Sequence, residues 1–300
     1  MKRKIIKQGA STLTISLPSA WTKQYDLSPG VEIEVEQKGK DLIVSTEKTF
    51  HSQKSELKLE GDEMYLNWTY LNSVYIRGDE EIKVIFDNDK IKDMAETCPG
   101  DYLGFAVVEQ GTNYFVIKEL TETKDVELES IVRRIFILIK LMAEDSLIFM
   151  KKDDIKSLNE LKRRDRTINS FVAFCLRTLN KKGYQDFQKS MLYSNIIILL
   201  EQLADEFHRL CRKIKDPLKK DQINMFEKVV IMVGEFYEAF YSYDKKKIKK
   251  IWKQRNELRE KITKMMKKTC TINEAQFYYR VQKIAESIVD IIKVQIGLKV

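Results

Sequence analysis

The sequence contains few of the residues on which many protein classes depend. Its 300 residues include 4 cysteines, and no two of them form a CxxC pair, which argues against a zinc knuckle or a disulfide framework. The longest purely apolar runs, 135–139 and 196–200, are far shorter than the ~20 residues of a membrane-spanning helix. The N-terminal segment also lacks the apolar region of a signal peptide, so we expect a cytoplasmic protein.

Residues suited to catalysis are equally scarce. There are 2 histidines, and one of them, His51, lies in a polar stretch that is typical of a linker. The chain has no GxSxG, HExxH or P-loop motif. We therefore expect that the protein is not an enzyme.

The positive charge, by contrast, is concentrated. The net charge is +8, and residues 244–268 alone contain 12 Lys or Arg against 3 acids. A second cluster lies at the N-terminus, where no acid occurs before Asp26. Each cluster could meet nucleic acid, an acidic partner or an anionic membrane surface. In the larger cluster the candidate anion or partner surface consists of Lys245, Lys246, Lys249, Lys250, Arg255 and Arg259.

Residues 1–48 predict a small separate domain. Short strands are expected at 4–7 and 13–17, and Ser19 is expected to cap a helix that runs through Tyr25. The Ser28-Pro29-Gly30 corner then leads to strands at 31–36 and 42–46. A unit of this size seldom has a sufficient core of its own, so we expect it to dimerise.

Residues 49–125 predict a mixed α/β segment. Residues 48–58 are polar and indicate a linker, after which a helix at 64–75 and a strand at 81–86 are expected. A short helix at 87–100 and a hairpin around Gly111 complete the segment.

From Val126 onward the pattern is that of long amphipathic helices. Breaks at Lys182-Gly183, Asp216-Pro217 and 269–271 suggest two groups of three helices, 126–216 and 217–300. A degenerate repeat supports this division, because LKRRDRTIN aligns with IWKQRNELR and LEQLAD aligns with VQKIAE. The six helices are expected at 126–152, 154–182, 187–214, 218–243, 246–270 and 273–298.

One face of the third helix has ligand-like spacing. Glu201, Asp205 and His208 stand at i, i+4 and i+7, so two carboxylates and an imidazole are aligned. Asp165 on the preceding helix could complete an oxygen-rich metal site. The alternative is a solvated polar face, which is common on helices.

The first 46 residues resemble the SpoVT/AbrB (MazE-like) swapped-hairpin DNA-binding domain. The resemblance rests on Gln8-Gly9-Ala10-Ser11, Ser16-Leu17-Pro18, Trp21 and Leu27-Ser28-Pro29-Gly30, with Asp26 and Val31 as departures. It implies an intertwined dimer with a two-fold surface that faces double-stranded DNA. Lys and Arg would neutralise phosphates, while Gln and hydroxyl groups would reach base edges or phosphate oxygens. The implied DNA-binding residues are Lys2, Arg3, Lys4, Lys7, Gln8, Ser11 and Thr12.

The helical part is similar to PhoU, the phosphate-uptake regulator family, whose fold is two tandem three-helix bundles. The family motifs are Asp-x-x-Ile/Val-Asp-Arg and Glu-x-x-x-Asp; DRTIN supplies Asp165 but has Asn169 at the second acid, and LEQLAD supplies Glu201 and Asp205. The resemblance implies a divalent metal or metal cluster (iron, zinc, magnesium or calcium) in the first bundle. The implied ligands are Asp165, Asn169, Glu201, Asp205 and His208.

The second bundle departs from the family. By the repeat alignment, Arg255 and Arg259 replace the two acids of one helix, and Gln282 and Glu286 replace Glu-x-x-x-Asp. Because a guanidinium cannot ligate a divalent metal, the second site is either lost or holds something anionic.

Taken together, the resemblances are to the archaeal PhoU-type regulators with an N-terminal AbrB domain. They imply an α+β multidomain protein with a swapped-hairpin β-barrel dimerisation domain, a small middle α/β segment and all-α tandem bundles. The implied function is a DNA-binding transcriptional regulator of phosphate uptake and homeostasis, acting as a homodimer or higher oligomer. The alternative is a signalling adaptor that binds a phosphate transporter or sensor kinase and uses the AbrB domain only to dimerise.

Overall fold

The computed structural model describes residues 1–38, 41–46, 54–61, 63–120, 127–184, 186–267 and 270–299. The chain divides into two compact units, Met1–Ser52 and Gln53–Val300. His51, most of the expected linker and the expected break at 269 lie outside the described residues.

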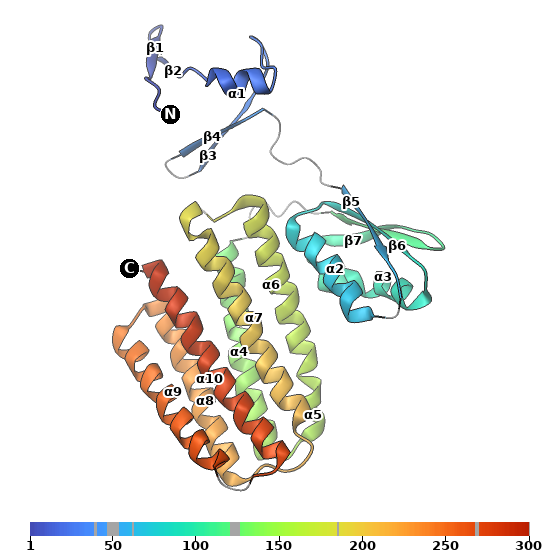
Figure 1. Cartoon of the computed structure of the whole chain (residues 1–300), viewed down its shortest axis with the longest axis vertical. Coiled ribbons are helices and arrows are strands. Elements are labelled where there is room, and N and C mark those ends of the chain that lie inside the picture. Colours follow the sequence, from blue (N-terminus) through green and yellow to red (C-terminus); the bar gives the residue numbers. More distant parts are fainter. Residues whose placement is uncertain are drawn as a thin grey trace. The chain divides into compact units, whose positions relative to one another are not determined.

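The first unit consists of two antiparallel hairpins and one short helix. Its elements are β1 (Ile6–Gln8), β2 (Thr12–Thr14), α1 (Ser19–Gln24), β3 (Glu34–Lys38) and β4 (Asp41–Ser45). Strand β1 pairs with β2, and β3 pairs with β4 (Figure 1). Ser19, which was expected to cap the helix, is instead its first residue, and Pro18 stands at the cap position. Because proline has no side-chain donor or acceptor, this helix has no side-chain capping hydrogen bond. Positive φ angles of 70° and 95° at Gly9 and Gly30 allow the two tight turns.

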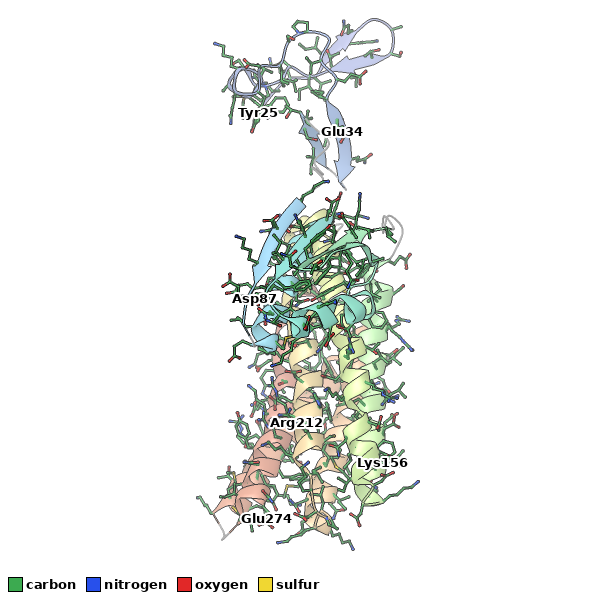
Figure 2. All side chains as sticks on the ribbon, turned by 90° about the vertical axis from the view of Figure 1, so that its right-hand side faces the viewer. Tyr25, Glu34, Asp87, Lys156, Arg212 and Glu274 are labelled. Atoms are coloured by element: carbon green, nitrogen blue, oxygen red, sulfur yellow. The ribbon has the colours of Figure 1, made fainter. Side chains whose placement is uncertain are left out.

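This first unit has no core of its own in the part that the structure describes. None of its described residues is buried, and large apolar side chains on all four of its strands face solvent. Figure 2 shows the side chains of this first unit as sticks, with Tyr25 and Glu34 labelled. The swapped-hairpin barrel therefore stays a prediction, since a barrel of this kind needs a second chain.

The second unit begins with a four-stranded sheet. Strand β5 is parallel to β6, and the order across the sheet is β5-β6-β8-β7. The expectation of a linker through residue 58 is wrong for its last part, since residues 54–59 form β5. The elements are β5 (Lys54–Leu59), α2 (Met64–Arg77), β6 (Glu81–Phe86), α3 (Asp89–Asp101), β7 (Phe105–Gln110) and β8 (Tyr114–Glu119).

Long helices form the rest of this unit. They are α4 (Leu128–Lys151), α5 (Ile155–Glu160), α6 (Lys162–Lys182), the 3₁₀ turn η1 (Phe187–Lys189), α7 (Ser190–Lys213), α8 (Lys220–Ser242), α9 (Lys245–Met266) and α10 (Ile272–Lys299). The expected helix at 154–182 is interrupted at Leu161, so that α5 and α6 are separate. The other long helices end within a few residues of their expected bounds.

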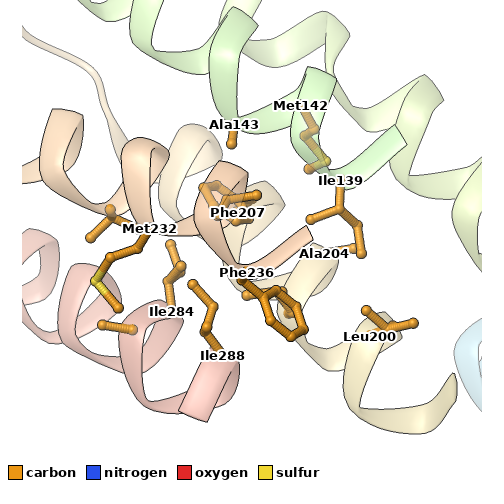
Figure 3. Packing of buried hydrophobic residues seen from close by; sticks show 14 of the residues in the cluster. Ile139, Met142, Ala143, Leu200, Ala204, Phe207, Met232, Phe236, Ile284 and Ile288 are labelled. Atoms are coloured by element: carbon orange, nitrogen blue, oxygen red, sulfur yellow. The ribbon is translucent and has the colours of Figure 1, made fainter. Parts of the chain in front are cut away.

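The helices form two groups of three around a single core. One group is α4, α6 and α7, the other is α8, α9 and α10, and α7 packs along α10 while α4 packs along α8 (Figure 1). In Figure 3 the side chains of Met142, Phe207, Phe236 and Ile288 converge from four different helices. The boundary near residue 217 is thus a turn between two halves that share one hydrophobic cluster.

The α/β segment is fixed to α6 by a buried cation. Arg177 Nη1 donates to the carbonyl oxygens of Tyr75 and Asp79 at 2.7 and 2.8 Å, and its Nη2 lies 2.7 Å from Glu119 Oε2. Ala173 of α6 belongs to the hydrophobic cluster of the sheet and its helices. The position of α6 is therefore coupled to that of the α/β segment.

Candidate functional site

The structure brings four of the five predicted metal ligands together. Asp165 lies in the first turn of α6 and is buried, with 6% of its surface exposed. Its Oδ2 lies 3.1 Å from Nδ1 of His208 on α7. Glu201 and Asp205 precede His208 on the same helix and interact electrostatically with Asp165. The i, i+4, i+7 pattern is thus an inward-facing acidic cluster and not a fully solvated face.

The cluster contains negative charge that the surrounding protein only partly compensates. Burial raises the pKa of Glu201 from 4.5 to about 7, and the charges of Asp205 and Asp165 contribute to this increase. Burial also raises the pKa of Asp205, although Arg209 opposes the effect. Asp165 Oδ1 is buried and has no hydrogen-bond partner. A bound cation would relieve both the repulsion and the unpaired oxygen.

Arg209 is the residue that the sequence analysis missed. Its Nη2 lies 2.5 Å from Asp205 Oδ2, and its Nη1 lies 3.1 Å from Glu206 Oε1. Glu206 is buried, and its Oε2 also accepts a hydrogen bond from Arg280 Nη1 at 2.7 Å. The i, i+4 spacing of Asp205 and Arg209 is the signal that could have revealed this pair.

Asn169, the fifth predicted ligand, stands apart from this network. It is exposed and lines a groove of about 670 Å³ between the α/β segment and the bundle, whose wall also includes Glu201, Trp68 and Lys162. Within the described ranges, no three His, Cys, Asp or Glu side chains are arranged so that they could hold a metal ion. The metal site therefore stays a prediction: Asp165, Glu201 and Asp205 have suitable oxygen donors, but Arg209 would have to release Asp205.

The second bundle has an ion pair at the corresponding position. Arg255 Nη1 lies 2.7 Å from Glu286 Oε2, and Arg259 Nε lies 3.3 Å from Glu286 Oε1. The residues that align with Asp165, Asn169 and Asp205 of the first bundle thus form ion pairs with one another, two arginines sharing one carboxylate. Of the two alternatives for this half, loss of the metal site accounts for the geometry without an external anion.

The predicted DNA-binding residues gather around the first hairpin. Lys7 and Gln8 belong to β1, and Thr12 begins β2 directly opposite Gln8. Ser11 lies in the connecting turn, and the other three precede β1. All seven are exposed, and none of their cationic groups forms an ion pair with a described residue. The hairpin therefore presents a basic surface with a polar tip.

The comparisons with known proteins do not assign this chain to a family. No protein-family model matches it. An alignment 142 positions long, which covers 42% of this chain and 25% of the other, is 27% identical to human atrial natriuretic peptide receptor 3. The fold is similar to that of the phosphate transport system regulatory protein PhoU from Streptococcus pneumoniae, with a TM-score of 0.45 and 17% identity over 57% of this chain and 93% of that chain.

Among the described residues, no helix is both long enough and apolar enough to cross a membrane.

Proposed function

We propose that this protein is a dimeric, DNA-binding transcriptional regulator of phosphate uptake. The N-terminal unit would bind double-stranded DNA, and the helical bundle would respond to a metal, to phosphate or to a protein partner. The resemblances of both parts to known families suggest this combination, and the structure supports it through the two surfaces described next.

The observation that supports the proposal most strongly is the exposed apolar surface of the first unit. Exposure reaches 68% for Ile5, 66% for Leu13 and 67% for Leu42. Monomeric proteins rarely leave so much of a small unit's apolar surface in water. A second copy of the same unit would cover these side chains and give both copies a shared core.

The basic hairpin suits DNA in such a dimer. Lysine and arginine side chains before and within β1 would neutralise phosphates, and Gln8, Ser11 and Thr12 would reach base edges or phosphate oxygens. Two copies related by a two-fold axis would present two such hairpins, which matches an operator with two half-sites.

The acidic cluster would be the sensor. Its charges are poorly compensated, so a divalent cation would bind more favourably than water at Glu201 and Asp165. Because α6 holds both Asp165 and Arg177, a ligand that shifts this helix would also shift the α/β segment.

The test is DNA binding by the full chain with Lys4→Ala and Lys7→Ala. Each lost lysine–phosphate contact reduces the slope of log affinity against log salt by about 0.9. A dimer that loses two such lysines in each chain should therefore show a slope smaller by about 3.6. A double variant that keeps the wild-type affinity and salt slope would disprove this DNA surface.

The same DNA-binding assay on the unmodified chain, together with sedimentation, separates the regulator from the signalling adaptor. A chain that sediments as a dimer and shows no salt-sensitive binding to any duplex would favour the adaptor, in which the exposed apolar residues serve dimerisation alone. In that case, binding to phosphate transporter or sensor kinase components becomes the function to test.

A further inference from the structure

Helix α9 contains the excess charge of the protein. Among its 22 residues are 10 Lys or Arg and 2 Glu, a surplus equal to the net charge of +8 of the whole chain. The helix packs beside α8 and α10 at the edge of the bundle (Figure 1). Its inner face is apolar, with Ile251, Leu258 and Ile262 buried.

The cations at the two flanks of α9 have partners on the neighbouring helices. Toward α8, Lys247 Nζ lies 2.5 Å from Glu238 and Lys250 Nζ lies 2.6 Å from Glu235. Toward α10, Arg255 and Arg259 share Glu286, as described above. These four cations contribute to packing, and the three carboxylates they contact compensate most of their charge.

The outward face is different. Lys245, Lys246, Lys249 and Lys264 are exposed, and none forms an ion pair with a described residue. At 1.5 Å per residue, the distance along the helix from the first to the last of these lysines is about 29 Å. The result is an elongated strip of lysines without ion-pair partners among the described residues, dense at the start of the helix and interrupted before Lys264 by Glu257 and Glu260.

The position of Lys245 and Lys246 at the start of α9 argues against a role for them in stability. The first turn of the helix contains Lys245, Lys246 and Lys247 and no acid. Positive charge is unfavourable there, because the helix N-terminus is itself the positive end of the helix dipole. Asp244 caps the helix by accepting from the backbone N–H groups of Lys246 and Lys247, but its single charge offsets only part of this repulsion.

The chemistry of the strip favours a polyanion with closely spaced charges. Its other outward residues are polar, among them Asn256, Glu257, Glu260 and Thr263, and the large apolar side chain that is exposed, Met266, stands at the end of the helix. Protein interfaces and membrane-surface helices need aromatic or aliphatic anchors on the contact face. A DNA duplex needs none, since its phosphates supply one charge per ~1.7 Å of helix axis.

We propose that the outward face of α9 is a second contact to double-stranded DNA, independent of sequence and made to the phosphate backbone. It goes beyond the proposed function, because it assigns DNA affinity to the helical bundle itself. The N-terminal hairpins would select the site, and α9 would add affinity for any neighbouring duplex.

The experiment compares full-length chains on a random-sequence DNA duplex. The variant Lys245→Gln, Lys246→Gln, Lys249→Gln should reduce the salt slope by about 2.7 per chain, at about 0.9 for each lysine. The matched control is Lys152→Gln, Lys156→Gln, Lys215→Gln, which lowers the net charge equally at exposed positions outside α9 and should leave the slope unchanged. Replacing the three α9 lysines by arginine should also preserve the wild-type salt slope, because arginine binds phosphate.

Folding is checked on the same proteins by thermal unfolding. The three glutamines should leave the melting temperature unchanged or raise it, because two of them remove positive charge from the first turn of α9 and the third replaces an exposed lysine without an ion-pair partner among the described residues. A loss of DNA affinity at an undiminished melting temperature is therefore a loss of contact.

Failure of this proposal can be told apart from failure of the proposed function. If the Lys4→Ala, Lys7→Ala chain changes the slope and the α9 variant does not, the α9 contact is wrong and the hairpin surface stands. If only the α9 variant changes it, α9 is a DNA contact and the hairpin surface is wrong. An α9 variant that loses binding to phosphatidylserine vesicles but not to DNA would assign the strip to membranes and overturn the proposal.

Discussion

Replacing Glu201 by glutamine should stabilise the metal-free protein at neutral and alkaline pH. The pKa of Glu201 rises from 4.5 to about 7, chiefly because the carboxyl group is buried beside Asp205 and Asp165. Folding therefore favours the protonated form, and the free energy of unfolding falls as the pH increases from about 4.5 to 7. Glutamine has the same shape without the charge, so this decrease should disappear in the variant.

The size of the effect follows from the pKa. One unit corresponds to 1.36 kcal/mol, so a rise from 4.5 to about 7 gives at most about 3 kcal/mol. The side chain is partly exposed, and solvent screening reduces the expected gain to about 1–2 kcal/mol. The gain should be complete above about pH 7 and absent below about pH 4.5.

The assay is urea unfolding of the wild type and Glu201→Gln at about pH 8 and about pH 5, in the presence of a chelator. The same pair is then measured with an added divalent metal. If the cluster binds it, the metal should stabilise the wild type and have little effect on the variant. Asp205→Asn should act in the same direction.

Two results would refute this reasoning. A variant that is less stable than the wild type at about pH 8 in chelator would show that Glu201 makes a favourable interaction there as an anion. Stoichiometric metal that survives Glu201→Gln with Asp205→Asn, as measured by elemental analysis, would place the metal elsewhere in the protein.

Three further predictions concern other parts of the chain. Leu13→Lys with Leu42→Lys should convert a dimer into a monomer in sedimentation experiments, because both side chains are about two-thirds exposed in the single chain; an unchanged dimer would place the interface elsewhere. Arg177→Met should cost about 3–5 kcal/mol of unfolding free energy, since Glu119 and two carbonyl groups lose a buried donor. In this variant, amide hydrogen exchange should increase first in 54–119. A loss of amide protection that is uniform over the whole bundle would argue against a local role for Arg177. Arg255→Ala and Glu286→Ala in a double-mutant cycle should show a coupling of about 1–3 kcal/mol, and additivity would mean that the ion pair contributes little.

The long helices were predictable because their periodicity is strong. A helix of 24 residues such as α7 repeats its apolar face many times, and the bounds 187–214 expected for it differ little from Ser190–Lys213. The hairpin of β7 and β8 was predictable for a similar reason, since its two strands are adjacent in the sequence.

Strand β5 was not predicted from the sequence because its pattern is short and charged. Its sequence KSELKL alternates, but Lys54 and Glu56 gave it the polarity of a linker. Both side chains have ion-pair partners on β6, Glu81 and Lys83, which follow the intervening helix α2. Sequence reasoning cannot supply such partners before the parallel pairing is known.

The acidic cluster was partly predictable from spacing. The periodicity placed Glu201, Asp205 and His208 on one face, and the expected packing of the preceding helix pointed to Asp165 as their neighbour. What spacing could not show is that Arg209 folds back onto Asp205, or that Arg177 finds its acceptors 58 to 102 residues away. Compensation of charge depends on side-chain directions that only the folded structure defines.

The most direct test of the central claim is a genome-wide map of DNA occupancy by the full-length protein, made in cells grown with high and with low phosphate. A regulator of phosphate uptake should occupy discrete sites, its occupancy should change between the two conditions, and Lys4→Ala with Lys7→Ala should abolish it. Occupancy no greater than background in both conditions, or sites that do not respond to phosphate, would contradict the account.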